Sequence, residues 1–247
     1  MILRRLKTHV EKENWFAVFL DFCIVVVGVF VGLQVQEWAQ ERERERQEEV
    51  YVSRLYDEVR NLESVRQPLL DTRRAILANL LTAGPVIHGK NDRPLTEAEC
   101  DSIAMSGIVT NPTDDLATLI ELQQAGGLTV FRDETVLDAI RTYRLTRARA
   151  RDVLNGTVRV VGLMVQDYPT LFQFSSELDP SKRLEGLFIC DLTAMRKDRG
   201  FVNTALWNSG AYEEHVRNNR LLSESLENLK HSLEAFMRKA PQHETTP

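Results

Sequence analysis

The five histidines are the first side chains to consider for metal or acid–base chemistry in this sequence of 247 residues. They are His9, His88, His215, His231 and His243. No HExxH or CxxC motif places ligands at a metal-binding spacing. His215 and His231 are expected on one C-terminal helix, but they are too far apart in the sequence to share a metal ion. We therefore expect exposed helix histidines, no metal site and no cofactor.

Motifs for nucleophilic catalysis and phosphate binding are also missing from the sequence. There is no GxSxG, Walker-type or GxGxxG motif, so a nucleophile elbow or a phosphate-binding loop has no support. The acidic pairs Asp114–Asp115 and Glu213–Glu214 are typical of charges at helix N-termini and on helix surfaces. We expect no catalytic residues, and we interpret the chain as a protein other than an enzyme.

Two of the three cysteines, Cys100 and Cys190, lie outside the apolar N-terminal segment that contains Cys23. In an oxidising compartment they could form a disulfide, which would close a long loop and contribute roughly 4 kcal/mol in the chain-entropy model. They could equally be two small buried hydrophobic residues. The sequence leaves both possibilities open.

The N-terminal apolar segment predicts a transmembrane helix over residues 15–38. From Trp15 to Leu33 the only charged residue is Asp21, and Trp15 and Trp38 bracket the segment where aromatic rings lie at the membrane interface. A buried core helix is disfavoured because charged residues flank the segment on both sides. A cleaved signal peptide is disfavoured because no small-x-small site follows the segment. We expect an uncleaved anchor in the lipid bilayer.

One face of the anchor is predicted to associate with another helix. At about 100° per residue, Ala17, Asp21, Gly28, Gly32 and Gln36 fall on the same side. Gly28 and Gly32 form a GxxxG pair, which lets a second helix approach closely. An ionised Asp21 facing lipid would cost on the order of 2–3 kcal/mol, and a partner helix reduces that cost. The expected partner is a second copy of the chain or another membrane protein.

The charges that flank the anchor indicate its orientation. The short tail of residues 1–14 carries Arg4, Arg5, Lys7 and Lys12, and a cationic tail crosses a membrane reluctantly. Long domains translocate largely regardless of their charge. We expect the tail in the cytoplasm and the C-terminal domain on the other side of the membrane.

The rest of the chain is predicted to be helical. Twelve glycines and eight prolines are few for this length, and a net charge of -5 disfavours binding to nucleic acid. Residues 39–67 are expected to form a charged helical stalk, 68–240 an extramembrane helical domain and 241–247 a frayed tail, with Pro68 kinking or ending the first long helix. Further helices are expected from Thr96 to Met105, from Asn111 to Gly126, from Asp133 to Pro169, and from Thr193 to Lys239 with a break near Gly210. The predicted class is all-α: a single transmembrane helix that continues into an irregular helical bundle.

Two stretches resemble a family of uncharacterised bacterial single-pass membrane proteins. Residues 25–38, VVVGVFVGLQVQEW, are similar to the anchor of that family, and residues 118–143, TLIELQQAGGLTVFRDETVLDAIRTY, are similar to its central motif. Gln36-Glu37 departs from the family pattern, in which Asn residues precede the Trp. The resemblance implies a bacterial inner membrane protein with a helical, periplasmic domain, and it implies no activity.

These observations predict a membrane-anchored interaction or scaffold protein, either oligomeric or an accessory subunit. The alternative is an extracytoplasmic sensor domain that binds a small molecule and signals through a membrane partner. The cytoplasmic tail is too short to form an output domain, so such a sensor would depend on that partner.

Overall fold

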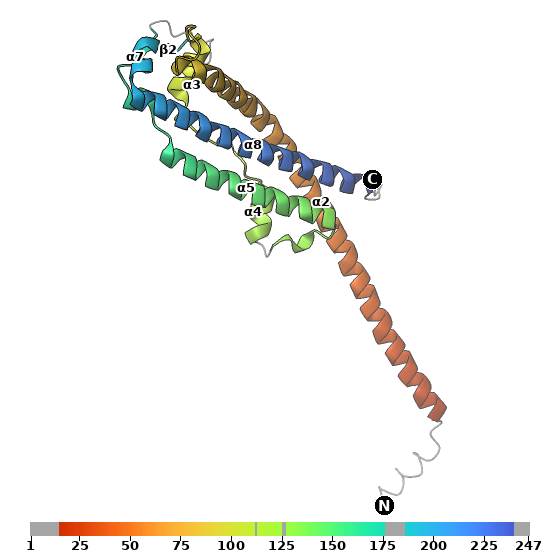
Figure 1. Cartoon of the computed structure of the whole chain (residues 1–247). Helices are drawn as coiled ribbons and strands as arrows, with labels where there is room; N and C mark the ends of the chain where they lie inside the picture. Colours follow the sequence, from red (N-terminus) through yellow and green to blue (C-terminus); the bar gives the residue numbers. More distant parts are fainter. Residues whose placement is uncertain (1–14, 112, 125–126, 176–185, 240–247) are drawn as a thin grey trace, which may run out of the picture. The chain divides into compact units, whose positions relative to one another are not determined.

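The computed structural model describes residues 15–111, 113–124, 127–175 and 186–239 of the chain (Figure 1). In chain order the elements are α2 (Trp15–Ile87), α3 (Glu97–Met105), α4 (Ala117–Gln124), the short 3₁₀ helix η1 (Leu128–Val130), α5 (Glu134–Val160), α6 (Met164–Asp167), β1 (Phe172–Phe174), β2 (Phe188–Cys190), α7 (Leu192–Lys197) and α8 (Arg199–Lys239). The predicted all-α class is confirmed.

The chain divides into two compact units, Met1–Val50 and Tyr51–Pro247, and α2 contributes to both. Residues 51–67, which we expected in the stalk, instead supply the buried side chains Val52, Leu55 and Val59 to the second unit. The structure therefore moves the start of the helical domain from residue 68 to Tyr51. The physical reason is that this part of α2 carries an apolar stripe that is buried against other helices.

Pro68 neither ends α2 nor separates two helices, in contrast to the sequence-based expectation. A proline inside a helix removes one backbone hydrogen bond and costs about 3 kcal/mol. Leu62 and Leu70 are buried on either side of Pro68, so tertiary packing holds both halves of the helix in place. This packing outweighs the local cost of the proline.

Two apolar clusters form the core of the second unit. The first cluster joins α2, α4, α5 and α8 through Val52, Leu55, Val59, Leu62, Leu116, Leu119, Leu122, Phe131, Val136, Leu137, Ile140, Tyr143, Ala150, Leu222, Leu226, Leu229 and Leu233. The second cluster joins α2, α3, α6, the two strands, α7 and α8 through Leu80, Ala83, Ile87, Cys100, Ile103, Ala104, Val109, Met164, Leu171, Phe172, Phe188, Met195, Phe201, Ala205, Tyr212 and Val216. The helices α5 and α8 pack side by side along their length (Figure 1).

The remaining elements differ from expectation mainly at their boundaries. The only strands among the described residues are β1 and β2, which pair antiparallel with Gln173 opposite Ile189. The helix expected from Asn111 begins only at Ala117 as α4, and residues 113–116 form neither helix nor strand. The expected break near Gly210 does not occur, and α8 is continuous there. Glycine in a helix costs only about 1 kcal/mol, which the buried α8 side chains on either side outweigh.

Candidate functional site

The N-terminal part of α2 is the apolar segment that the sequence singles out. From Phe22 onward α2 is long and apolar enough to cross a membrane, with a mean hydropathy of 1.7 in its apolar stretch and no residue of that stretch buried. Its exposed large side chains are Phe22, Ile24, Val25, Val26, Val27, Val29, Phe30, Val31, Leu33 and Val35. A contiguous apolar surface of this kind needs a lipid or protein environment, because leaving it in water is costly.

The residues expected on the association face fall into two groups. Gly28, Gly32 and Gln36 are exposed, and a Cβ atom added at either glycine would meet nothing within 4 Å. The positions are therefore open to a neighbouring helix. Ala17 and Asp21 belong to α2 by their backbone, but their side chains lie outside the described part of the structure.

Trp38, one of the two expected interface residues, is exposed and lies against an arginine. The guanidinium carbon of Arg42 is 4.2 Å from the centroid of the Trp38 ring, which is within range of a cation–π interaction. An amphipathic ring with a cation one helical turn further on is typical of residues at a membrane interface. The side chain of Trp15, the other expected interface residue, lies outside the described part.

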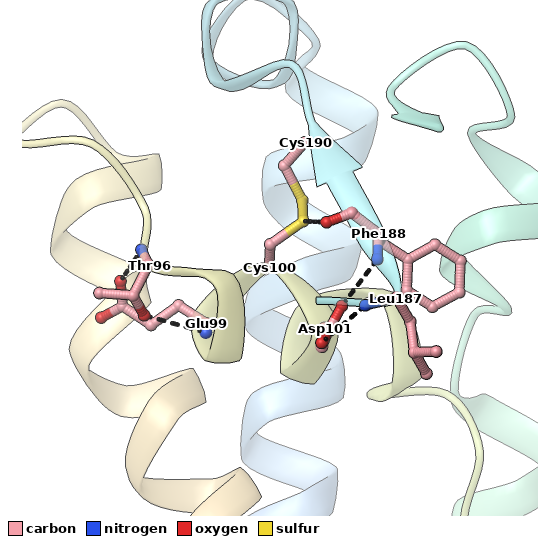
Figure 2. The surroundings of a disulfide bond; sticks show 7 residues. All are labelled: Thr96, Glu99, Cys100, Asp101, Leu187, Phe188 and Cys190. Carbon is pink, nitrogen blue, oxygen red and sulfur yellow. Dashed lines mark hydrogen bonds between the residues drawn. A yellow bond between two sulfur atoms is a disulfide. The ribbon is translucent and has the colours of Figure 1, made fainter. Parts of the chain in front are cut away.

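Cys100 on α3 and Cys190 on β2 are joined by a disulfide, with a Cα–Cα distance of 5.8 Å (Figure 2). The adjacent residue Asp101 reinforces this link. Its carboxylate accepts hydrogen bonds from the backbone N–H groups of Leu187 at 3.2 Å and Phe188 at 2.9 Å. The Cys100 sulfur lies 3.2 Å from the carbonyl oxygen of Phe188, as a close contact since a disulfide sulfur carries no hydrogen. Together these contacts fasten β2 to α3.

The start of α3 is fixed by a capping box between Thr96 and Glu99. Glu99 N–H donates to the Thr96 hydroxyl at 3.2 Å, and Thr96 N–H donates to the Glu99 carboxylate at 2.9 Å (Figure 2). Arg93 adds a bidentate pair to that carboxylate, at 2.6 and 2.7 Å. These arginine hydrogen bonds favour the ionised form and lower the pKa of Glu99 to about 2. The cap positions the two residues that follow it, Cys100 and Asp101.

A layer of buried polar side chains lies between the two apolar clusters. On α2 it falls between Leu62 and Leu80, and on α8 between Tyr212 and Leu222. We call this the polar layer. It consists of the buried residues Arg66, Arg73, Asp114, Tyr143, His215 and Asn219 and the partly buried Arg147. Arg66 donates to the carbonyl oxygen of Thr113 at 3.2 Å and to Asn219 Oδ1 at 3.3 Å, while Arg73 donates to Thr110. Two arginines thus enter the core with neutral hydrogen-bond partners.

The anion of the polar layer is paired with other cations. Asp114 forms ion pairs with Arg147 at 3.1 Å and Arg151 at 2.6 Å, and its backbone carbonyl accepts a hydrogen bond from the Tyr143 hydroxyl at 2.6 Å. Among the described residues, neither Arg66 nor Arg73 is paired with a carboxylate. Burial therefore lowers the pKa of both arginines, because it penalises the charged form.

His215 lies within this layer with none of its surface exposed. Burial, and in second place the charge of Arg73, lowers its pKa to about 4. The expectation of exposed helix histidines is therefore wrong for His215, because its position on α8 faces the interior. Asp114 likewise is no surface charge, since Arg147 and Arg151 hold it in the core.

An open groove of about 710 Å³ runs between α2 and α8. Five basic and four acidic side chains line it, together with Tyr56 and the apolar Leu70 and Leu226. Arg66 of the polar layer forms part of its wall. Among the described residues, no group of three or more His, Cys, Asp or Glu side chains is placed to hold a metal ion.

The sequence contains a signal for the polar layer in the spacing of the apolar residues of α2. Val52, Leu55, Val59 and Leu62 follow alternating spacings of three and four residues. If that spacing is continued, the next positions are Arg66, Leu69, Arg73, Ile76 and Leu80. Both arginines therefore fall in the stripe that faces the core. A charged residue in such a stripe is the pattern that marks a buried polar group.

The chain was compared with protein-family models, with curated proteins and with solved structures, and none of the three comparisons gave a match.

Proposed function

We propose that the protein is a membrane-anchored interaction or scaffold protein, acting as an oligomer or as an accessory subunit of a membrane complex. The observation that carries this proposal is the apolar stretch of α2, whose large side chains from Phe22 to Val35 are exposed. In a bilayer, lipid tails cover the exposed apolar side chains of such a helix. Its small residues remain free to contact another helix.

The face that contains Gly28 and Gly32 is the proposed contact. Both positions are open, so a partner backbone can approach without displacing a side chain of this chain. Helices in a bilayer associate chiefly through close packing, which small residues promote. Asp21 lies on the same side of the helix by its sequence position, and contact with a partner helix lowers the cost of placing a carboxylate there.

The location we propose is a bacterial inner membrane, with the helical domain in the periplasm. The Cys100–Cys190 disulfide supports this orientation, because disulfides persist in oxidising compartments and are rare in the cytosol. The cationic N-terminal tail supports it independently through the positive-inside rule.

A dimerisation reporter fused to the segment from Lys12 to Gln40 tests the proposal. We expect Gly28→Ile, Gly32→Ile and Asp21→Leu to weaken association. Val26→Ile is the matched control, because Val26 lies about 140° away from Asp21 around the helix. Glycine variants that associate as well as the control would place the interface elsewhere.

The second candidate function, a small-molecule sensor, has one observation in its favour: the open groove between α2 and α8. Its volume suits a small ligand, and α2 is the helix that also contains the anchor segment. A melting-temperature screen of the full chain against small solutes tests it, and no ligand-dependent shift would count against sensing.

A further inference from the structure

The groove between α2 and α8 is lined by five basic and four acidic side chains, and one of the basic side chains is buried. Basic side chains enter it from both helices, among them Arg60, Arg66 and Arg74 from α2 and Arg220 from α8. Its apolar lining residues are Leu70 and Leu226, which lie at the bottom of the groove with 3% and 1% of their surface exposed. A polar rim over an apolar floor is the composition of a site for a small organic molecule.

Most of the acidic side chains of the groove are already engaged. Glu63 is paired with Lys230 at 2.7 Å, and Glu224 with Arg220 at 2.6 Å. Glu234 accepts a hydrogen bond from the Tyr56 hydroxyl at 3.1 Å. These contacts occupy carboxylates that could otherwise neutralise Arg66 from the groove side.

Arg66 is the exceptional member of the wall. It is 3% exposed, and the acceptors of its two terminal nitrogens, Thr113 O and Asn219 Oδ1, are uncharged. Its Nε is buried and has no hydrogen-bond partner in the described part of the chain. A buried guanidinium without a counter-charge is strongly destabilising, since desolvation is not compensated.

The surroundings of Arg66 offer little compensation. Asp114 attracts Arg66 at a distance, but it is shared between Arg147 and Arg151. Arg73, two helical turns further along α2, is a second buried cation, and its Nη1 has no hydrogen-bond partner among the described residues. The interior behind the groove is thus positively charged, and an anion in the groove would be attracted to it.

We propose that the groove between α2 and α8 binds the oxyanion group, carboxylate or phosphate, of a small organic solute, with Arg66 as the buried positive charge that attracts it. Arg220 and the Ser223 hydroxyl lie at the rim and supply hydrogen bonds to the same group, while Leu70 and Leu226 contact the organic part. The groove is far larger than a phosphate ion, which leaves room for that organic part. This inference deepens the sensing function and is independent of association through the anchor.

The test is a titration of the full chain in detergent micelles with sodium succinate and, separately, with sodium phosphate. Sodium chloride at matched ionic strength is the control for general screening. We expect a saturable rise in melting temperature with at least one of the two oxyanions, because a ligand that binds the folded state stabilises it by mass action. A response to succinate alone identifies a carboxylate ligand, and a response to phosphate alone a phosphate ligand.

Two variants and a matched control locate the site. Arg220→Gln is expected to raise the oxyanion concentration at the titration midpoint about tenfold, which is the effect of losing one charge-assisted hydrogen bond. Arg217→Gln is the control: it removes a comparable surface pair, with Glu214, from the same helix outside the groove. Arg66→Gln is expected to abolish the response, and Arg220→Gln still decides the question if that variant does not fold.

Three results would overturn the proposal. They are the absence of a saturable shift with both oxyanions, an equal shift in sodium chloride, and equal midpoints for Arg220→Gln and Arg217→Gln. Each of these leaves the association of the anchor untouched, since the anchor residues play no part in this measurement.

Discussion

Removal of the Cys100–Cys190 disulfide is expected to destabilise the helical domain strongly. The two cysteines are separated by 90 positions in the sequence, so the bond closes a long loop in the unfolded chain. The chain-entropy model gives about 4.6 kcal/mol for a loop of this length. This is an upper figure, because an unfolded chain that retains structure gains less entropy when the bond is lost. In the folded state Asp101 still accepts hydrogen bonds from Leu187 and Phe188, so β2 stays attached to α3. For a domain of this size the corresponding fall in melting temperature is roughly 10–15 °C.

The assay compares the full chain in detergent micelles with the double variant Cys100→Ser/Cys190→Ser. Circular dichroism at 222 nm follows unfolding, and alkylation of the denatured, unreduced chain counts free thiols. We expect one alkylated thiol in the native chain, at Cys23, and no change in melting temperature for the control Cys23→Ser. Three alkylated thiols would show that Cys100 and Cys190 are not bonded and are two buried hydrophobic residues instead. A double variant with the same melting temperature as Cys23→Ser would show that the bond does not stabilise the domain.

Three further outcomes follow from the structure. Because the pKa of His215 is about 4 in the folded chain and near 6.5 when unfolded, the unfolded state binds the proton first as the pH falls. The free energy of unfolding should therefore be highest above pH 6.5 and fall by about 3 kcal/mol towards pH 4. In urea titrations this fall should be absent from His215→Gln and retained in the control variant of an exposed histidine, His231→Gln. Asp101→Asn should cost about 1–3 kcal/mol in the same assay, since it disturbs two backbone hydrogen bonds, whereas the exposed Asp71→Asn should be near neutral. Protease added to intact spheroplasts should remove the helical domain, and full protection would contradict the periplasmic orientation.

The class and several element boundaries could be predicted because they depend on local signals. The capping box at Thr96 and Glu99 fixes the start of α3, and Asp133 caps α5 through the N–H groups of Thr135 and Val136. Such caps act over three residues, so the sequence alone contains the whole interaction.

The continuity of the long helices could not be predicted from local signals. Pro68 disfavours a helix locally, but Leu62 and Leu70 are buried against residues distant in the sequence. The same holds for Gly210 in α8. Local propensities of about 1–3 kcal/mol are overridden when tertiary packing on both sides is larger.

The candidate sites divide in the same way. The apolar anchor and its glycine pair are visible in the sequence, because their pattern lies within one helix. The polar layer and the groove are assembled from α2, α5, α8 and the stretch that precedes α4, so Arg66, Asp114 and His215 become neighbours only in the folded chain. Their sequence contexts resemble ordinary charged helix faces, which is why His215 and Asp114 were expected at the surface.

Photo-crosslinking in the native membrane can establish whether the anchor associates through one face. p-Benzoylphenylalanine is placed at Val35, about 40° from Asp21 around the helix, or at Phe30, about 180° away. The two side chains are similarly exposed in the single chain, at 57% and 63%, so accessibility alone does not distinguish them. We expect a crosslinked product from position 35, either a dimer or an adduct with another membrane protein, and little from position 30. Equal or stronger crosslinking from position 30, or no product from either position, would contradict association through this face.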